Sequence, residues 1–336
     1  MEHIAIGNSG LTTSRIGLGT WAIGGWMWGG TDEAQSIATI RSAVERGVTL
    51  IDTAPAYGFG RSEEIVGKAL AEGGLRDRVQ IATKVGLDWE GEAVFRNSSP
   101  SRVRKEIEDS LRRLRTEFID LYQVHWPDIE TPFSETARTL EDLRREGKIR
   151  AIGVSNYSPA QMDSFRAEAH LDAVQPPYNL FEREIEADVM PYAKDTGLTI
   201  LSYGALCRGL LSGRMTIETK FEGDDLRLAD PKFNAEHFHQ YLAAVDELKE
   251  LARGRFGKSV LALAVRWVLD SGPTIALWGA RRPDQLDPIT EIDGWKIDDA
   301  AKKDIDTILA RIVNPISPQF MAPPLRRQPK RRRSAA

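Results

Sequence analysis

Residues 49–71, TLIDTAPAYGFGRSEEIVGKALA, contain the pattern that decides the fold. The stretch begins with a short β-type run, Thr49–Asp52, that ends in a polar residue, and it closes with a longer amphipathic segment, Ser62–Ala71. A strand followed by a helix is the repeating unit of a sheet with parallel strands. We therefore interpret this stretch as one βα unit.

The same unit recurs along the chain. Eight runs resemble strands: Ile16–Gly19, Thr49–Asp52, Gln80–Lys84, Ile119–Val124, Ile149–Val154, Ala173–Gln175, Thr199–Tyr203 and Thr274–Leu277. Helix-like segments lie between and after them: Asp32–Arg46, Ser62–Ala71, Ser101–Leu114, Ser134–Glu146, Pro159–Glu168, Glu184–Thr196, Ala235–Phe256, Val260–Asp270 and Asp298–Val313. A doubly wound sheet is the alternative, but eight strands without a glycine-rich first turn favour an α/β fold of the (β/α)8 TIM-barrel type with an extra C-terminal helix.

The length of 336 residues would allow two domains of about 150 residues each. A closed barrel routinely exceeds 250 residues as one domain. We therefore predict a single barrel domain over residues 1–313. Residues 314–336 are rich in proline and basic residues, and we expect them to form a flexible, poorly packed tail.

The charge of the chain excludes several classes of partner. Lys and Arg total 45 and Asp and Glu total 49, a net charge of −4 that provides no field for nucleic acid or an anionic membrane. Six of the eight residues Arg326–Arg333 are basic, but this patch is short and lacks aromatic residues that could stack on bases. We expect neither nucleic acid nor membrane as a partner.

The lone cysteine, Cys207, excludes an intramolecular disulfide and fits a reducing compartment. The first residues, MEHIAIGNSG, lack the features of a signal peptide, and no apolar run reaches the roughly 18 residues of a spanning helix. We expect a cytoplasmic protein. His237 and His239 lack partners at ligand spacing, so no metal site is predicted.

Side chains that can carry a proton stand at the ends of successive predicted strands. Asp52 and Tyr57 follow the second strand, Lys84 ends the third and His125 follows the fourth. The C-terminal ends of barrel strands share one rim, so we expect these four residues to meet. Lys84 would stabilise a tyrosinate and lower the pKa of Tyr57, which makes Tyr57 a candidate general acid. The alternative is a structural Asp52–Lys84 ion pair with Tyr57 as packing.

Four segments around these residues resemble the signatures of the aldo-keto reductase family, over about residues 3–313. They are Asp52-Thr53-Ala54-Pro55-Ala56-Tyr57-Gly58, Ala82-Thr83-Lys84-Val85-Gly86, Val124-His125-Trp126-Pro127-Asp128 and Gly153-Val154-Ser155-Asn156-Tyr157. Residues 6–11 and 16–21 resemble the N-terminal β-hairpin and first strand of the bacterial branch that includes inositol-operon and general-stress reductases. The resemblance implies a catalytic set of Asp52, Tyr57, Lys84 and His125.

The resemblance also implies a nicotinamide dinucleotide site. Ser155, Asn156 and Gln175 would hold the nicotinamide carboxamide, and Tyr203 would stack on its ring. The remaining implied contacts are Thr20, Trp21, Asp52, Gly204, Leu206, Arg208, Gly209, Leu211, Arg214, Gly279, Ala280, Arg281 and Gln285.

Two arginines, Arg281 and Arg282, stand beside the helix start at Pro283 and suit a dianionic 2′-phosphate. NADP(H) is therefore the preferred cofactor. NAD(H) stays open because Ile289, preceded by Pro288, stands where the family usually carries an asparagine that contacts adenine.

The loops after the first strands are rich in aromatic residues, which we take as the substrate pocket: Trp21, Trp26, Trp28, Phe59, Trp89 and Trp126. Aromatic faces bind sugars as well as apolar aldehydes, and packing beneath the loops is their alternative role.

The sequence therefore predicts an NADPH-dependent reductase that converts aldehydes or ketones to alcohols by hydride transfer, with Tyr57 as general acid. An NAD(P)+-dependent sugar 1-dehydrogenase is the alternative, and a cofactor-sensing regulator similar to potassium-channel β subunits is a second one. The substrate would be a small carbonyl compound or a sugar, and the oligomeric state stays open.

Overall fold

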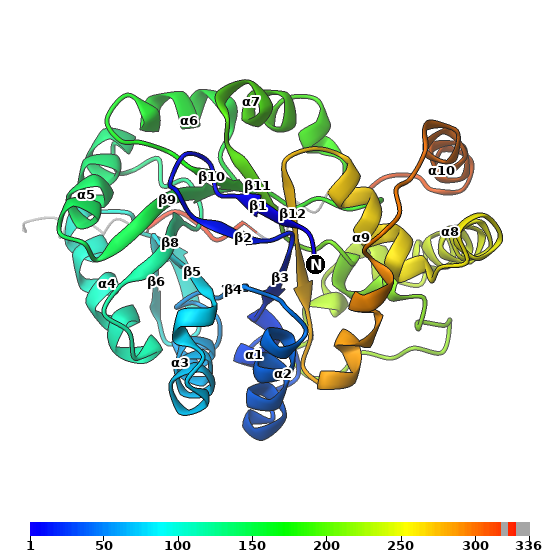
Figure 1. Cartoon of the computed structure of the whole chain (residues 1–336), viewed down its shortest axis with the longest axis horizontal. Coiled ribbons are helices and arrows are strands. Elements are labelled where there is room, and N and C mark those ends of the chain that lie inside the picture. Colours follow the sequence, from blue (N-terminus) through cyan, green and yellow to red (C-terminus); the bar gives the residue numbers. More distant parts are fainter. Residues whose placement is uncertain (317–321, 327–336) are drawn as a thin grey trace, which may run out of the picture.

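Eight parallel strands close into a barrel, which confirms the predicted fold class (Figure 1). The computed structural model describes residues 1–316 and 322–326. Around the barrel the strand order is β10-β11-β12-β3-β4-β5-β8-β9. The bounds are β3 Ile16–Gly19, β4 Leu50–Asp52, β5 Gln80–Val85, β8 Ile119–Val124, β9 Ile149–Ser155, β10 Ala173–Gln175, β11 Thr199–Ser202 and β12 Thr274–Gly279. Each lies within two residues of its predicted strand.

Helices surround the barrel, and all but the first, a four-residue helix that was not predicted, lie at the predicted places. They are α1 Trp21–Gly24, α2 Glu33–Glu45, α3 Arg61–Gly73, α4 Pro100–Leu114, α5 Phe133–Arg145, α6 Pro159–Arg166, α7 Val189–Thr196, α8 Phe238–Leu251, α9 Val260–Asp270 and α10 Asp299–Ile312. Short 3-10 turns join them, including η2 Glu184–Glu186, η3 Cys207–Ser212, η4 Leu226–Leu228, η5 Pro231–Phe233 and η7 Pro283–Glu291.

Two predicted helices are shorter in the structure. The segment predicted from Glu184 is a 3-10 turn, and α7 begins only at Val189, because a proline such as Pro191 is tolerated in the first turn but not farther inside a helix. The segment predicted to end at Phe256 changes at Ala252 from α8 to a single π-helical turn.

One hairpin lies at each end of the barrel. The predicted N-terminal hairpin, β1 (His3–Ala5) with β2 (Thr12–Ser14), lies across the N-terminal ends of the strands in Figure 1. Its connecting turn places Ile6, fully buried, against the barrel-interior residues Leu50, Leu121 and Leu201. The second hairpin, β6 (Leu87–Glu90) with β7 (Ala93–Arg96), was not predicted. It follows β5 directly and therefore stands over the C-terminal ends of the strands.

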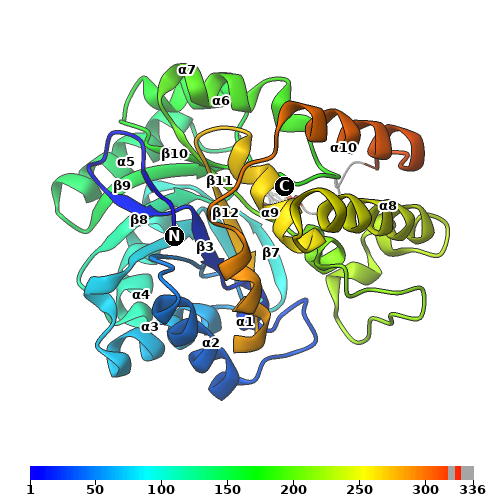
Figure 2. The ribbon, with the colours of Figure 1, turned by 45° about the vertical axis from the view of Figure 1, so that its right-hand side comes forward.

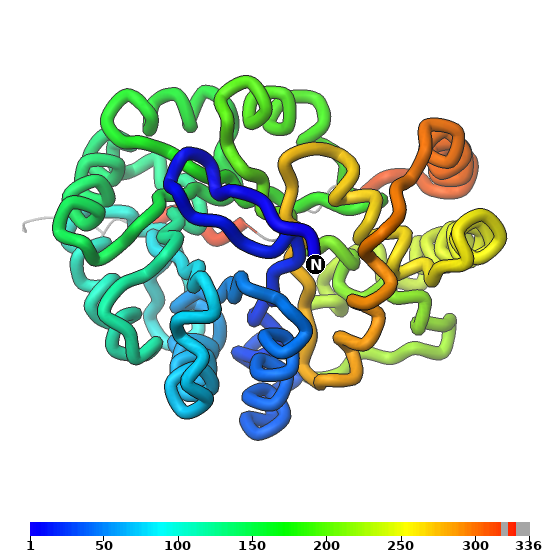
Figure 3. The backbone as a smooth tube through the Cα atoms, in the orientation of Figure 1, coloured from blue at the N-terminus to red at the C-terminus, as the bar shows by residue number. Residues whose placement is uncertain are grey.

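Helices α8 and α10 lie side by side outside the ring of barrel helices (Figure 2). Beyond α10, residues 322–326 return to the barrel and are visible through its opening as the red segment in Figure 3. Arg96 of β7 binds this segment by donating its backbone N–H to Pro324 O at 2.9 Å and its Nε–H to Pro323 O at 2.8 Å. Residues 322–326 are therefore tied to the barrel by hydrogen bonds, although Ala322, Pro324 and Arg326 are exposed. The flexible tail stays a prediction, and most of the basic cluster, residues 327–333, lies outside the described residues.

Within the described part of the chain, no helix is long and apolar enough to cross a membrane.

Candidate active site

A cavity of about 530 Å³ opens at the C-terminal ends of the barrel strands. It runs from the ends of β4 and β8 past β10 and β11 to the segment after β12. Most of the residues predicted for catalysis and cofactor binding line it: Thr20, Trp21, Asp52, Tyr57, His125, Ser155, Asn156, Gln175, Tyr203, Gly204, Leu206, Arg208, Gly209, Gly279, Ala280, Arg281 and Gln285.

The floor of the cavity holds a buried ion pair in contact with a phenol. Lys84 Nζ lies 2.6 Å from Asp52 Oδ1, and it donates to Thr53 O at 3.0 Å and to Tyr57 Oη at 3.2 Å. Lys84 and Asp52 are almost fully buried. Parallel pairing of β4 with β5 places Asp52 opposite Ala82, so the two charged side chains reach each other from neighbouring strands.

A tight turn places Tyr57 over this pair. The backbone N–H of Tyr57 donates to Ala54 O at 3.1 Å. The turn packs directly on α1: a Cβ on Gly58, where φ is +67°, would lie 2.2 Å from Gly24 O, so only glycine fits. Stacking of the Tyr57 ring on Trp21, with centroids 5.7 Å apart, fixes its orientation.

The predicted lowering of the Tyr57 pKa is wrong for this structure. Burial raises the pKa of the phenol well above its ordinary value, and the Asp52 carboxylate raises it further. Because Asp52 lies closer to Lys84 than Tyr57 does, the ammonium charge is already balanced by a carboxylate. Tyr57 is therefore a protonated phenol at neutral pH.

The imidazole of His125 faces Tyr57 edge-on, with ring centroids 5.7 Å apart. Burial lowers the pKa of His125 well below its ordinary value, and the nearby Lys84 ammonium lowers it further. The ring is therefore neutral at physiological pH and can donate one N–H. Within the described residues no hydrogen-bond partner occupies its side chain, so it is available to a ligand.

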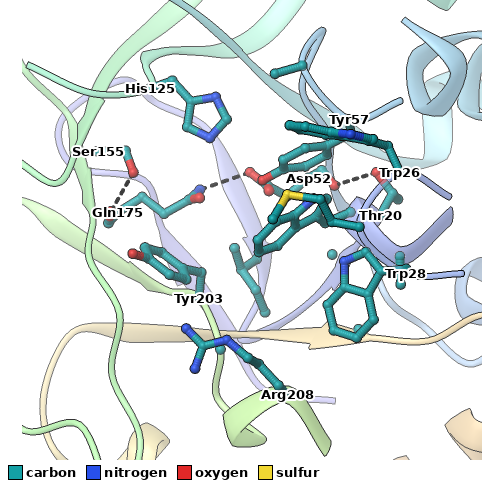
Figure 4. Close-up of a pocket in the computed structure, with 18 of the residues that line it drawn as sticks. Thr20, Trp26, Trp28, Asp52, Tyr57, His125, Ser155, Gln175, Tyr203 and Arg208 are labelled. Atoms are coloured by element: carbon teal, nitrogen blue, oxygen red, sulfur yellow. Dashed lines mark hydrogen bonds between the residues drawn. The ribbon is translucent and has the colours of Figure 1, made fainter. Parts of the chain in front are cut away.

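Amide and hydroxyl groups form the opposite wall (Figure 4). Ser155 Oγ donates to the backbone oxygen of Gln175 at 2.7 Å, and Tyr203 Oη donates to Asn156 Oδ1 at 2.9 Å. Asn156 adopts φ +64° and donates its side-chain N–H to His125 O at 3.1 Å. These bonds fix the wall at the ends of β9, β10 and β11.

A buried network of charges holds the loop after β11, and no pattern in the sequence indicates it. Arg208 Nη1 lies 3.2 Å from Glu182 and 2.7 Å from Asp230, and Lys232 Nζ lies 2.9 Å from the same Glu182. These partners come from segments separated along the chain, so only the fold brings them together. Arg208 reaches the cavity as predicted (Figure 4), with its charge balanced from behind.

The far end of the cavity carries excess positive charge. Arg281 Nη1 donates to Trp28 O at 2.8 Å, and burial and the neighbouring Arg227 lower the pKa of Arg281. Gln285 Oε1 accepts from the backbone N–H of Arg281 at 2.8 Å. Arg282 points outward and pairs with Asp284 at 3.1 Å. Asp225 pairs with Arg227 at 2.6 Å, whereas Arg281 forms no ion pair within the described residues. A partly buried arginine of this kind favours an anionic ligand.

Ile289 is 4% exposed and packs in the core beneath η7. Its side chain does not line the cavity, so the position that departs from the family pattern offers no contact to a ligand there.

The loop that carries Trp26 and Trp28 is tied to the loop after β11. Asp224 accepts from the backbone N–H groups of Met27 at 2.7 Å and Gly29 at 2.9 Å, and the N–H of Leu226 donates to Met27 O. This contact spans the cavity between the catalytic floor and the cationic end. Sequence reasoning missed Asp224, which resembles any exposed loop carboxylate.

Some predicted residues do not line the cavity. Trp21, Trp26, Trp28 and Trp126 line it, whereas Phe59 and Trp89 pack behind Trp26, with ring centroids 4.9 Å (Trp26–Phe59) and 5.7 Å (Phe59–Trp89) apart. Leu211 is buried outside the cavity, and Arg214 is exposed to solvent. In these cases the loops turn the side chains away from the cavity, and the residue type alone does not indicate this orientation.

The rim contains residues that the sequence did not single out. Leu87, Glu92 and Val94 come from the hairpin β6–β7, and Ala322, Pro323 and Pro324 come from the returning tail segment. Arg96 joins the two parts and also donates to Pro127 O at 2.9 Å. The tail segment had no sequence signal, because it lies far along the chain from the strands that it covers.

Among the described residues, no group of three His, Cys, Asp or Glu side chains is placed to hold a metal ion.

Comparisons with known proteins agree with this geometry. The model of the aldo/keto reductase family matches residues 15–310. The aldo-keto reductase YhdN of Bacillus subtilis (strain 168) is 59% identical over 98% of this chain and 100% of its own length. The NADH-specific methylglyoxal reductase of Escherichia coli (strain K12) is 36% identical over 85% of this chain and 91% of its own.

A solved structure is also similar. The glycerol dehydrogenase AKR11B4 from Gluconobacter oxydans superimposes with a TM-score of 0.87 and is 58% identical, covering 95% of this chain and 99% of its own.

The lowered pKa of His125 gives a direct test of the floor of the cavity. In an NMR titration, the His125 ring protons, assigned by comparison with His125→Gln, are expected to show no inflection between about pH 6 and 8. Lys84→Met removes the second cause of the shift, so the pKa of His125 should rise in that variant. An inflection near the ordinary histidine value in the unmodified protein would contradict the assigned environment.

Proposed function

The chain belongs to the aldo/keto reductase family, whose members are oxidoreductases acting on carbonyl and alcohol groups, and from that premise we propose that it reduces aldehydes and ketones to alcohols with NADPH. The observation that carries the proposal is the contact of Tyr57 Oη with Lys84 Nζ, at 3.2 Å, at the floor of a largely aromatic cavity. A protonated phenol backed by a buried cation is a proton donor for a carbonyl oxygen.

The residues of the floor have complementary roles in this reaction. A nicotinamide cofactor supplies the hydride when bound. Tyr57 donates its proton to the carbonyl oxygen, and Lys84 stabilises the tyrosinate that remains. Neutral His125 donates an N–H to the same oxygen and orients it. Asp52 keeps Lys84 charged in its buried position.

The protonation state of Tyr57 suits reduction. Reduction needs a phenol that carries its proton, and Tyr57 carries it at neutral pH. A catalyst accelerates both directions of a reaction, so this state does not decide between a reductase and a sugar 1-dehydrogenase, and one relative is named as a glycerol dehydrogenase. The choice between these two functions therefore rests on the substrate end of the cavity.

The residues along the cavity fit a nicotinamide dinucleotide phosphate. Ser155, Asn156 and Gln175 would hold the carboxamide, and Arg281 would face the 2′-phosphate. The indole N–H of Trp28 is buried and lacks a hydrogen-bond partner within the described residues, so the cavity wall contains a donor that a polar ligand would satisfy. The relative named as NADH-specific is only 36% identical, and the unmatched charge at Arg281 favours NADPH here.

The substrate end of the cavity favours an uncharged, partly apolar aldehyde. Trp26, Trp126 and Val94 surround it together with the prolines of the tail segment 322–326. The exposed Glu92 forms no ion pair within the described residues and disfavours an anionic substrate. Few hydroxyl or amide groups face this end, whereas a sugar would need several hydrogen-bond partners.

The second alternative, a cofactor-sensing regulator that catalyses no reaction, would bind the same cofactor. Two observations favour an enzyme: Lys84 contacts both Asp52 and Tyr57, and the relatives are named as enzymes.

Tyr57→Phe tests the proton donor. We expect the rate of aldehyde reduction to fall by about 100-fold or more, while fluorescence titration shows nearly unchanged NADPH affinity, because the phenyl ring keeps its stacking on Trp21. Retention of most of the rate would require another acid. Binding of NADPH by the unmodified protein without reduction of any carbonyl would favour the regulatory alternative.

Arg281→Ala tests the cofactor preference. NADPH affinity is expected to fall about tenfold or more, the loss of a charge-assisted contact, with NADH affinity unchanged. Arg282→Ala is the matched control: the same substitution, one position away, at a side chain that points outward and pairs with Asp284. Equal affinity of the unmodified protein for NADPH and NADH would refute the preference.

Two truncations test the substrate end. Deletion of residues 322–336 removes the prolines at the rim, so the KM for an aryl aldehyde is expected to rise about tenfold with unchanged NADPH affinity. Deletion of residues 326–336 leaves these prolines in place and should leave carbonyl reduction intact. Loss of activity in the shorter deletion would show that the basic cluster takes part in the reaction.

A further inference from the structure

We propose that Gln123 is a positioning residue that sets the orientation of the Gln175 amide and so presents Gln175 Oε1 to the carboxamide N–H of the cofactor. This inference rests on the proposed function, because it concerns how the same site recognises the nicotinamide. Gln123 was not among the residues that the sequence analysis selected. It is the second-to-last residue of the strand β8 and is fully buried inside the barrel.

Two hydrogen bonds join the two amides to Asp52, and a third joins the amides to each other. Gln175 Nε2 donates to Asp52 Oδ2 at 2.9 Å, which Figure 4 shows, and Gln123 Nε2 donates to the same oxygen at 3.3 Å. Gln175 Nε2 also donates to Gln123 Oε1 at 3.3 Å. The other carboxylate oxygen, Oδ1, accepts from Lys84.

These contacts allow one orientation of the Gln175 side chain. An ionised carboxylate only accepts hydrogen bonds, so both amides must turn their nitrogen atoms toward Asp52. Gln123 Oε1 then faces the second N–H of Gln175. In the flipped orientation, Gln175 would place its oxygen against a carboxylate oxygen and a carbonyl oxygen at once.

Gln175 Oε1 is the amide atom that remains available to a ligand. With both N–H groups of Gln175 engaged, its Oε1 has no donor within the described residues, and Gln175 lines the cavity whereas Gln123 does not. An acceptor in that place recognises an N–H group of a ligand. The nicotinamide carboxamide offers an N–H group, and its analogue with an acetyl group in the same place does not.

The neighbouring strand leaves space for Gln123. Gly153 of β9 is its register partner, and a Cβ on this glycine would lie 2.8 Å from Gln123 Cγ and 3.3 Å from Gln123 Oε1. The backbone of Gly153 does not adopt a positive φ, so the requirement for glycine there comes mainly from the space that Gln123 occupies, with the backbone oxygen of Ala173 also 3.3 Å from such a Cβ. A second substitution can therefore move Gln123 without changing its amide.

The test compares NADP+ with its 3-acetylpyridine analogue, which lacks the carboxamide N–H, by quenching of tryptophan fluorescence. In the unmodified protein we expect NADP+ to bind about fivefold or more tightly than the analogue, the typical value of one hydrogen bond. Gln123→Leu should reduce this ratio severalfold toward one, mainly through weaker NADP+ binding. Gly153→Ala should reduce it in the same direction.

Two further variants separate positioning from general damage. Gln80→Leu is the matched control, since Gln80 begins the barrel strand β5 at the opposite end, and it should leave the ratio unchanged. Gln175→Leu should abolish the preference, and adding Gln123→Leu to it should cause no further loss, because Gln123 acts through Gln175.

Three results would overturn the inference: equal weakening of both cofactors by Gln123→Leu, an unchanged ratio in both Gln123→Leu and Gly153→Ala, or no preference in the unmodified protein. If the unmodified protein bound neither cofactor, the proposed function itself would fail, which is a distinct outcome.

Discussion

Neither Asp52 nor Lys84 could keep its charge at the floor of the barrel without the other. Taking one ion out of water costs several kcal/mol, and only a close partner with further hydrogen bonds offsets that cost. The 2.6 Å contact between them provides the partner, and Thr53 O and two glutamine amides complete the shell. Neighbouring parallel strands supply the two ions at one rim, so the barrel geometry is what permits the pair.

The distribution of charge along the cavity follows from this pair. Burial keeps both Tyr57 and His125 neutral; the Asp52 carboxylate adds to this effect at Tyr57, and the Lys84 ammonium adds to it at His125. The network around Arg208 is likewise balanced by Glu182 and Asp230. Asp225 balances Arg227, so Arg281 is left with a positive charge that no ion pair within the described residues matches. A ligand that is neutral at one end and anionic at the other matches this polarity.

The sequence predicts the parts of this site that depend on local order, and it misses those that depend on packing. Strand ends share a rim in any parallel barrel, so the meeting of Asp52, Tyr57, Lys84 and His125 could be expected from strand counting alone. The raised pKa of Tyr57 could not, because burial depends on every neighbour. The prolines at residues 323–324 are bound at the rim by Arg96, a contact between segments far apart in the chain.

Gln123 shows why the barrel interior is the hardest part to predict from sequence. A glutamine between apolar residues of a strand resembles a tolerated polar residue, and its position two residues before His125 suggests no role. Its importance comes from the closed sheet, in which side chains from β4, β8 and β10 point to one axis and converge on one carboxylate oxygen. Asp52 orients the amides of Gln123 and Gln175, and the Gln175 amide in turn faces the ligand. The ion pair beneath Tyr57 therefore also influences how the opposite wall of the cavity recognises a ligand.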